Sequence, residues 1–191
     1  MRSPAEREIK KDVILRKCFE CLTEKGIEAI TIKDFSDATG MSMSSIYYWF
    51  EDKDEIVLDA VEWGLDENVK ILFDFAFRHT DNLTELCKGI KELAMEYKKQ
   101  FRLIFQVATS PQYGEIVREF STKLDFEYKR YTEILSEKLA ISYDLLYPFV
   151  NLFVSSIVDC VMWDSWDKFD MEMKSIITVI EEKSNGFVGA E

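Results

Sequence analysis

The most informative segment of the chain is Ile14–Val57, which reads ILRKCFECLTEKGIEAITIKDFSDATGMSMSSIYYWFEDKDEIV. It begins inside a stretch from Ile9 to Lys25 whose apolar residues recur mostly at spacings of three and four. That period predicts a helix with one buried face. Gly26 is expected to end this helix, because glycine commonly follows the last helical turn.

A second, short helix is expected to begin at Thr31. A threonine hydroxyl caps a helix N-terminus well, and Asp34, three residues later, completes the pattern of a capping box. Gly40 is expected to end this helix.

A third helix is expected from Met43 to Phe50, with Ser42 as its capping residue. Only residues 39–41 separate it from the second helix, and a connection this short that contains glycine produces a sharp crossing angle. These features together predict a helix-turn-helix.

The rest of the chain also favours helices. The sequence is 47% hydrophobic, and its 7 Gly and 3 Pro leave long uninterrupted segments. A helix capped by Asp52 is expected to run to about Phe77, and further helices are expected at 83–108, 113–139, 144–166 and 168–183. The expected fold is all-α with about nine helices. A three-helix helix-turn-helix domain is expected at 1–53 and a larger helical domain at 54–191.

Charge is distributed unevenly along the chain. The formal net charge of −12 argues against a nucleic-acid partner, because phosphate neutralisation requires Lys and Arg. Residues 1–17, however, carry six basic and three acidic side chains, whereas residues 56–191 hold 24 acidic and 15 basic ones. An acidic body with a small basic face would dock on DNA through that face alone.

The segment resembles the N-terminal signature of the TetR family of one-component bacterial regulators. The matching features, in chain order, are Lys25-Gly26, Thr31, the Gly-x-Ser of Gly40–Ser42, Ile46-Tyr47-Tyr48-x-Phe50 and Lys53-Asp54-Glu55-Ile56. They follow one another without a gap over roughly a quarter of the chain. The resemblance implies an N-terminal DNA-binding domain followed by a helical ligand-binding and dimerisation domain.

The resemblance also implies which residues contact DNA. The first turn of a recognition helix enters a groove about 12 Å wide, and Met43, Ser44 and Ser45 are small or flexible enough to do so. Lys53, in the first turn of the next helix, is expected to attract a phosphate. The full set of candidate DNA-binding residues is Thr31, Lys33, Ser42, Met43, Ser44, Ser45, Tyr47, Tyr48, Trp49 and Lys53.

Two of these residues depart from the family pattern. Met43 stands where a basic or amide side chain is frequent, and Trp49 stands where histidine is frequent. Neither side chain can form a bidentate hydrogen bond with a base. Sequence readout would then depend on DNA shape or on contacts with thymine methyl groups.

Aromatic residues are more numerous after the helix-turn-helix than a helical core requires, although packing alone explains any single one. As a group they predict a mostly apolar ligand pocket, and in the family the pocket lies within the region that corresponds to residues 63–131. The candidate lining residues are Trp63, Phe73, Phe77, Phe101, Phe105 and Tyr131.

The stretch Asp144–Trp166 is almost continuously apolar, so more than one of its faces must be covered. Together with 168–183 it resembles the two helices with which family members form a four-helix bundle between subunits. The candidate dimer-interface residues are Phe149, Phe153, Ile157, Val161, Ile176 and Ile180.

Several other classes of protein find little support. No apolar run is expected to reach the length of a membrane span and the N-terminus is charged, so the cytoplasm is the expected location. Cys18 and Cys21 lie on the apolar face of the first helix, which favours reduced core thiols over a metal site. His79 is the only histidine, so a histidine-based catalytic site has little to build on. No enzyme activity, metal or cofactor is expected.

These patterns predict a ligand-responsive DNA-binding transcriptional regulator. We expect a homodimer that represses transcription from a near-palindromic operator in double-stranded DNA and is released by a small, mostly apolar effector. Two alternatives stay open. In the first alternative the protein is an activator. In the second it is a helical sensor or interaction protein whose helix-turn-helix serves only as a scaffold.

Overall fold

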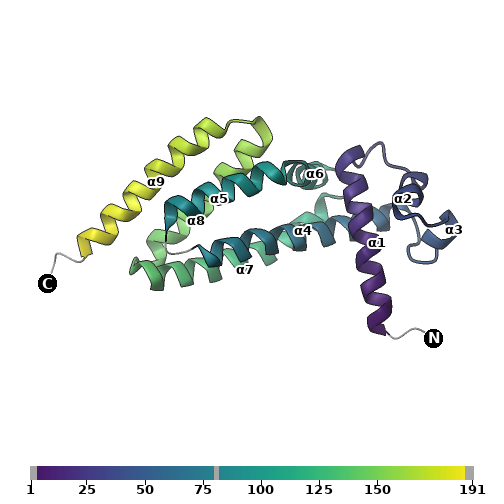
Figure 1. Ribbon diagram of the computed structural model, residues 1–191, viewed down its shortest axis with the longest axis horizontal. Helices are drawn as coiled ribbons and strands as arrows, with labels where there is room; N and C mark the ends of the chain where they lie inside the picture. Colours follow the sequence, from purple (N-terminus) through teal and green to yellow (C-terminus); the bar gives the residue numbers. More distant parts are fainter. Residues whose placement is uncertain (1–3, 80–81, 188–191) are drawn as a thin grey trace. The chain divides into compact units, whose positions relative to one another are not determined.

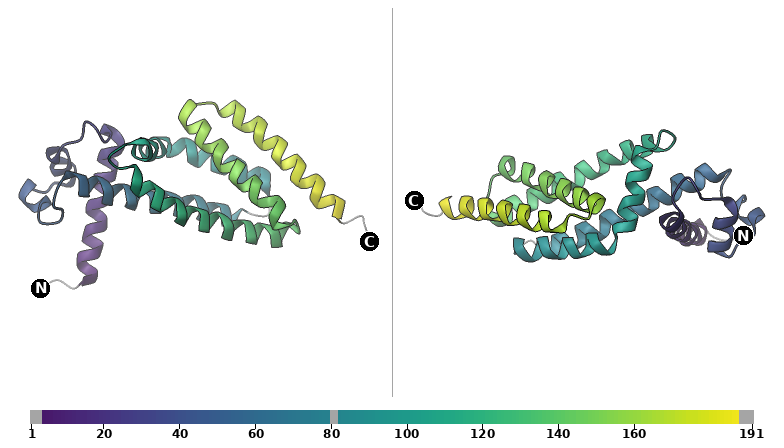
Figure 2. Two further views of the ribbon diagram at one scale, coloured as in Figure 1. Left: turned by 180° about the vertical axis from the view of Figure 1, so that it is seen from behind. Right: turned by 90° about the horizontal axis from the view of Figure 1, so that it is seen from above.

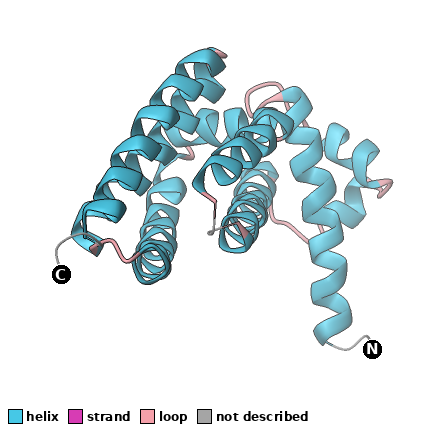
Figure 3. Cartoon of the chain, turned by 60° about the vertical axis from the view of Figure 1, so that its left-hand side comes forward, coloured by secondary structure: helices cyan, strands magenta, loops and turns pink. Residues whose placement is uncertain are grey.

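The computed structural model describes residues 4–79 and 82–187, and over these residues it consists of helices joined by loops (Figure 3). The all-α prediction is confirmed. In the described residues the helices, labelled in Figure 1, are α1 (Pro4–Lys25), α2 (Ile32–Thr39), α3 (Met43–Ile46), α4 (Lys53–Arg78), α5 (Leu83–Glu96), α6 (Lys98–Thr109), α7 (Gly114–Leu139), α8 (Tyr143–Trp163) and α9 (Trp166–Phe187).

The chain divides into two compact units. Unit 1 contains residues 1–68 and 102–120, and unit 2 contains residues 69–101 and 121–191. Helices α4, α6 and α7 therefore contribute residues to both units. The predicted boundary between residues 53 and 54 separates a DNA-binding part from a ligand-sensing part. The two compact units do not test that division of roles, so it stays a prediction.

The capping signals around α2 work as predicted. The side chain of Thr31 accepts a hydrogen bond from the backbone N–H of Asp34 at 3.3 Å, and the Asp34 carboxylate accepts one from the backbone N–H of Thr31 at 2.9 Å. Gly40 ends the helix with φ at 69°, in the left-handed region that favours glycine. Gly26 ends α1 in the same way, with φ at 76°.

Helix α3 is shorter than the sequence predicts. Ser42 caps it as expected, but regular helix ends at Ile46, and residues 47–49 form a turn. The Ile46 carbonyl accepts hydrogen bonds from the N–H groups of both Trp49, at 2.8 Å, and Phe50, at 3.1 Å. This tightening ends the helix and still buries Phe50, which is 2% exposed. The expectation of a helix as far as Phe50 was therefore wrong at its C-terminal end.

Unit 1 is built around α1 and the first part of α4. Its fully buried side chains include Leu22, Phe35, Ile46, Ile56, Val57, Val61 and Val107. Gly64 lies directly against the ring of Phe19, and a Cβ atom there would come within 2.2 Å of that ring. The absence of a side chain at this position lets α1 and α4 approach closely.

Unit 2 is centred on α8 and α9, which lie side by side as an antiparallel pair (Figure 2). Its core includes Leu146, Val161 and Phe169, each at most 1% exposed. Gly89 on α5 approaches the ring of Phe75 on α4, where a Cβ atom would lie 2.0 Å from a ring carbon. Apolar side chains from five helices, α4, α5, α7, α8 and α9, therefore meet in one core.

Two helix boundaries in the second half differ from the prediction. The single helix expected at 83–108 is two helices, because Tyr97 leaves helical geometry with φ −94° and ψ 19°. The residue is near the point where the chain passes from unit 2 to unit 1, and no glycine or proline marks it. The helix expected at 144–166 ends at Trp163, because Asp164 adopts a left-handed conformation with φ at 60°.

Helix α8 also corrects the expectation about apolar length. By length and composition it is the one helix in the described residues that is long and apolar enough to cross a membrane. Buried side chains such as Leu146, Val150 and Cys160 face the core of unit 2, and a buried core helix meets the same criterion. Packing in unit 2 therefore explains part of its apolar character, since 33% of its most apolar stretch is buried.

Candidate nucleic-acid interface

The turn between α2 and α4 separates inward-facing from outward-facing side chains. Ile46 and Phe50 are 1% and 2% exposed and anchor this turn in the core of unit 1. Met43, Tyr47 and Tyr48 point outward and are 52%, 54% and 70% exposed. A surface with three large, exposed, partly apolar side chains on one short element is suited to contact a partner.

The three serines at the start of α3 form a hydrogen-bonded cluster. The Ser42 side chain accepts a hydrogen bond from the Ser45 N–H at 3.2 Å, as an N-cap does. Its hydroxyl also lies 2.9 Å from the Ser44 hydroxyl and 2.8 Å from the Ser45 hydroxyl. All three serines are exposed, so this first turn is compact and accessible.

The α2 side of the candidate interface contributes Thr31 and Lys33, both exposed. Thr31 is held by Asp34, whose carboxylate also pairs with Lys25. The hydrogen bonds from Lys25 and then Thr31 lower the pKa of Asp34 to about 2. Lys33 precedes Asp34 in the chain, and Asp34 is already paired with Lys25. The exposed Lys33 side chain carries its charge at the surface.

Trp49 is half-buried, unlike the neighbouring tyrosines. The Lys10 Nζ atom lies 5.8 Å from the centre of the Trp49 ring, within the range of a cation–π contact. The Tyr48 ring meets the Trp49 ring edge to face, with centroids 5.8 Å apart. Lys10 on α1 is therefore part of this surface, although the sequence motif does not contain it.

Lys53 is the first residue of α4 and is half-buried. The carboxylate of Asp52 accepts a hydrogen bond from the N–H of Glu55 at 2.9 Å, which confirms Asp52 as a cap. Lys53 therefore lies in the first turn of a capped helix, between Asp52 and Asp54.

The loop between α6 and α7 is hydrogen-bonded to the same turn of α4. The Tyr113 hydroxyl donates to one Asp54 carboxylate oxygen at 2.6 Å, and the Gln112 side-chain amide donates to the other at 2.7 Å. Burial, and then the hydrogen bond to Asp54, raise the pKa of Tyr113 to about 12, so this hydroxyl stays a donor at neutral pH. Sequence reasoning missed this contact, since nothing local pairs positions 58 and 59 residues apart.

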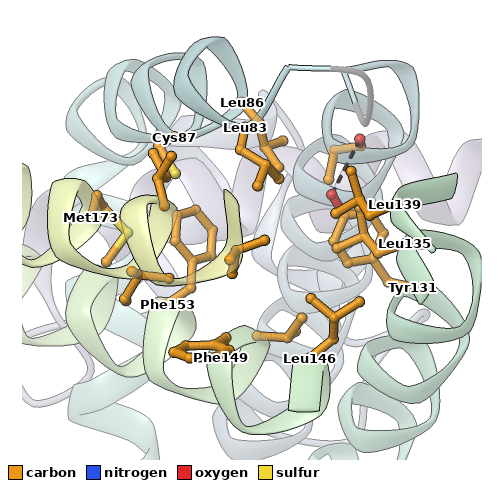
Figure 4. A pocket seen from close by; sticks show the side chains of 15 residues that line it. Leu83, Leu86, Cys87, Tyr131, Leu135, Leu139, Leu146, Phe149, Phe153 and Met173 are labelled. Carbon is orange, nitrogen blue, oxygen red and sulfur yellow. Dashed lines mark hydrogen bonds between the residues drawn. The ribbon is translucent and has the colours of Figure 1, made fainter. Parts of the chain in front are cut away.

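Unit 2 contains an apolar cavity of about 70 Å³. Figure 4 shows Leu83 and Leu86 of α5 on one side of it and Phe149 of α8 on the other. Its remaining lining residues are Ala76, Cys87, Tyr131, Leu135, Leu139, Leu146, Val150, Phe153, Met173, Ile176, Ile177 and Ile180. Burial raises the pKa of Cys87 to about 12, so the cavity wall carries no charge at neutral pH.

Polar atoms at this cavity are few. The Tyr131 hydroxyl donates to the Ala76 carbonyl at 3.4 Å, drawn as a dashed line in Figure 4. Burial also raises the pKa of Tyr131 above its ordinary value. A cavity of this kind favours a ligand that is mostly apolar.

The six candidate ligand residues do not come together. Tyr131 lines the cavity, and the rings of Phe73 and Phe77 lie 5.9 and 5.2 Å from its ring. Phe101 packs against the unit 2 core. Trp63 and Phe105 belong to unit 1, where Trp63 meets Phe19 edge to face.

The six candidate dimer residues face the interior of unit 2. Ile157, Val161, Ile176 and Ile180 are at most 9% exposed, while Phe149 and Phe153 are half-buried at the cavity. A different set of large apolar side chains is exposed on α8 and α9, namely Leu152, Met162, Trp163, Met171 and Val179. The sequence pattern did not separate these two sets, because both follow the helical period.

The four cysteines are free thiols. Cys18 is buried, and burial raises its pKa to about 12, which opposes the thiolate that a metal needs. In the part of the chain that the structure describes, no three His, Cys, Asp or Glu residues are grouped as metal ligands. His79 lies just after α4, stacked on the Phe75 ring with centroids 4.1 Å apart.

The family model described as bacterial regulatory proteins of the tetR family matches residues 14–60, which include α2, α3 and the first turns of α4. The N-terminal part of the chain is therefore a TetR-type domain. Proteins with this domain are bacterial regulatory proteins, which supports the interpretation of the chain as a transcriptional regulator.

Two relatives that are similar over most of this chain are named as transcriptional regulators. The transcriptional repressor KstR2 of Mycolicibacterium smegmatis is 24% identical over 165 residues, 78% of each chain. The negative regulator IcaR of the biofilm operon icaADBC in Staphylococcus epidermidis is 24% identical over 190 residues, 91% of this chain and all of that protein. A TetR-family regulator from Marinobacter aquaeolei has the same fold, with a TM-score of 0.61 at 16% identity over 94% of this chain and 97% of that one.

Proposed function

We propose that this TetR-family regulator is a homodimeric repressor that binds an operator in double-stranded DNA and is released by a small, mostly apolar effector. The observation that carries the proposal is the exposed face of Met43, Tyr47 and Tyr48 on a helix-turn-helix whose other face is buried. The relatives KstR2 and IcaR are named as a repressor and a negative regulator, which favours repression over activation.

On DNA, the first turn of α3 enters the major groove. Met43, Ser44 and Ser45 then face base edges, while Ser42, Tyr47, Tyr48, Trp49, Thr31, Lys33 and Lys53 contact the phosphate backbone or the groove wall. Two subunits place their α3 helices roughly 34–36 Å apart, one turn of the duplex. That spacing makes a near-palindromic operator the expected partner.

The exposed side chains of α8 and α9 form the dimer surface in this proposal. Leu152, Met162, Trp163, Met171 and Val179 are the available apolar residues, since those predicted from the sequence are used inside the protomer. Exposed aromatic and Met residues are enriched at interfaces. Trp163, at 75% exposure, is the best single anchor.

The apolar cavity of unit 2 is the proposed effector site. Its volume of about 70 Å³ is well below the ~300 Å³ at which ligand pockets usually begin, so a ligand must displace lining side chains. Phe73 and Phe77 on α4 lie against Tyr131 of the cavity wall, and α4 continues back to Lys53. A displacement there changes the spacing of the two α3 helices and weakens both half-sites together.

A gel-shift titration against genomic fragments at low salt tests the proposal directly. We expect one class of fragments to be retained by the dimer and to be released as salt rises, because phosphate contacts depend on counterion release. Lys53→Ala should weaken binding to all fragments and reduce the salt slope by about one unit. If no fragment is retained, the repressor proposal is overturned. The protein is then the alternative, a helical sensor or interaction protein whose helix-turn-helix serves only as a scaffold.

A further inference from the structure

The recognition element lacks the side chains that usually read bases. Between Ser42 and Phe50 the chain has no Arg, Lys, Asn or Gln. Bidentate recognition of guanine needs Arg or Lys, and bidentate recognition of adenine needs Asn or Gln. The turn from α3 to α4 therefore has to distinguish base pairs by some other chemistry.

The serines offer little discrimination. Ser44 and Ser45 both lie within hydrogen-bonding distance of the Ser42 hydroxyl, so their hydroxyls are shared with the capping arrangement. A serine hydroxyl also rotates and serves as donor or acceptor, so it accepts several bases at similar cost. Specificity from these two residues alone would be low.

Met43 is the residue that remains at the tip of the element. It is the first residue of α3, and the N-terminal residues of a recognition helix are those that reach base edges. Its side chain is 52% exposed, unbranched and polarisable, and it adapts to an irregular apolar surface. Ile46, three residues on, is buried, whereas the Met43 side chain stays half exposed.

The major-groove edges of the bases carry one prominent apolar group, the C5-methyl of thymine. A thioether chain gains free energy by removing that methyl from water, whereas the polar edges of the other bases lose hydration against it. The contact involves no charge and therefore depends little on salt.

We propose that Met43 is a specificity-determining residue that selects a thymine in each operator half-site through its C5-methyl group. The inference rests on the proposed DNA-binding function. It explains how a recognition turn without a basic or amide side chain can still select a sequence.

The test replaces thymine by deoxyuridine, which removes only the methyl group. A bound site is first selected from a random duplex pool with the full-length dimer, and each thymine of a half-site is then replaced singly. One position should lose about fourfold in affinity, and the symmetric double replacement about fifteen-fold, as expected for one buried methyl in each half-site. The same ratios should appear at low and high salt.

Variants of the protein assign the effect to Met43. Met43→Ala should bind thymine and uracil duplexes equally, and Met43→Leu, which keeps the apolar volume, should retain most of the preference. Tyr47→Phe is the matched control on the same face, since it leaves the proposed methyl contact in place. Because Met43 is exposed, thermal unfolding of these variants should match the parent protein.

The outcomes are distinct. Equal affinity for thymine and uracil at every position overturns the inference and leaves the DNA-binding function intact. A preference that survives in Met43→Ala assigns the methyl contact to another residue and also overturns it. Failure to select any duplex overturns the proposed function together with the inference.

Discussion

The recognition turn in unit 1 and the α8–α9 pair in unit 2 are both rich in large apolar and aromatic residues, yet their sequences are unequally informative. Around α3, each side-chain direction follows from a local signal, since Ser42 begins the helix and Ile46 and Phe50 anchor it. Along α8, apolar residues occur on every face, and only the packing of neighbouring helices separates core from surface. Polar capping residues specify local structure. In a helix that is apolar on every face, the helices that pack against it determine which face is buried.

The core residues of the two regions give the largest expected effect. Phe35 in unit 1 and Phe169 in unit 2 are 0% and 1% exposed. Replacing either by Ala should lower the free energy of unfolding by about 3–5 kcal/mol, because a cavity replaces a buried ring. Urea unfolding followed by circular dichroism measures the loss. A loss below about 1 kcal/mol at Phe169 would mean that the core of unit 2 is not as tightly packed as described.

The next effect sharpens the distinction between the surface and the core of α8. Trp163→Asp should raise the dimer dissociation constant at least about thirty-fold, the scale of an interface hot spot. Ile157→Val, a mild change in the protomer core, should leave dimerisation unchanged and lower stability by about 1 kcal/mol. Sedimentation equilibrium separates the two results. A Trp163→Asp protein that dimerises normally would contradict the dimer surface proposed on α8 and α9.

Tyr113 tests whether the recognition turn is controlled by distant residues. Tyr113→Phe removes the hydrogen bond to Asp54 but keeps the ring, so stability should fall by about 1 kcal/mol. Because Lys53 adjoins Asp54, we also expect the variant to bind operator DNA while responding less to effector. The response to effector is the loss of the shifted DNA band when an apolar extract of the cells that naturally make the protein is added. An unchanged response would mean that the Tyr113–Asp54 hydrogen bond has no part in the response to effector.

The smallest expected effect concerns the cap of α2. Thr31→Ala should cost about 1 kcal/mol, as the loss of an N-cap usually does. Asp34 adds a pH dependence, since its hydrogen bonds hold its pKa at about 2 instead of 3.8. A depressed pKa contributes stability that is present above pH 3.8 and is lost as the pH falls toward 2. The stability difference between the parent and Asp34→Asn, measured by thermal unfolding, should therefore shrink over that range.

The predicted helix boundaries are correct where the sequence carries a local capping signal and wrong where it carries none. Thr31, Asp34 and Gly40 act through atoms within a few residues, so their pattern predicted α2 correctly. The break at Tyr97 carries no glycine, proline or cap, and it lies where the chain leaves one unit for the other. Apolar periodicity predicts which face of a helix is buried, but it does not show where the chain passes from one unit to the other.

Local signals in the sequence specify the helix-turn-helix, its caps and the outward face of α3, because each depends on hydrogen bonds and apolar spacing within about two helical turns. Only the packing of the helices separates the apolar side chains of α8 and α9 that line the core or the cavity from those that are left exposed. It also decided the contact of Tyr113 and Gln112 with Asp54. These features bring together residues far apart in the chain, and their free energy comes from burial that exists only once the helices have met.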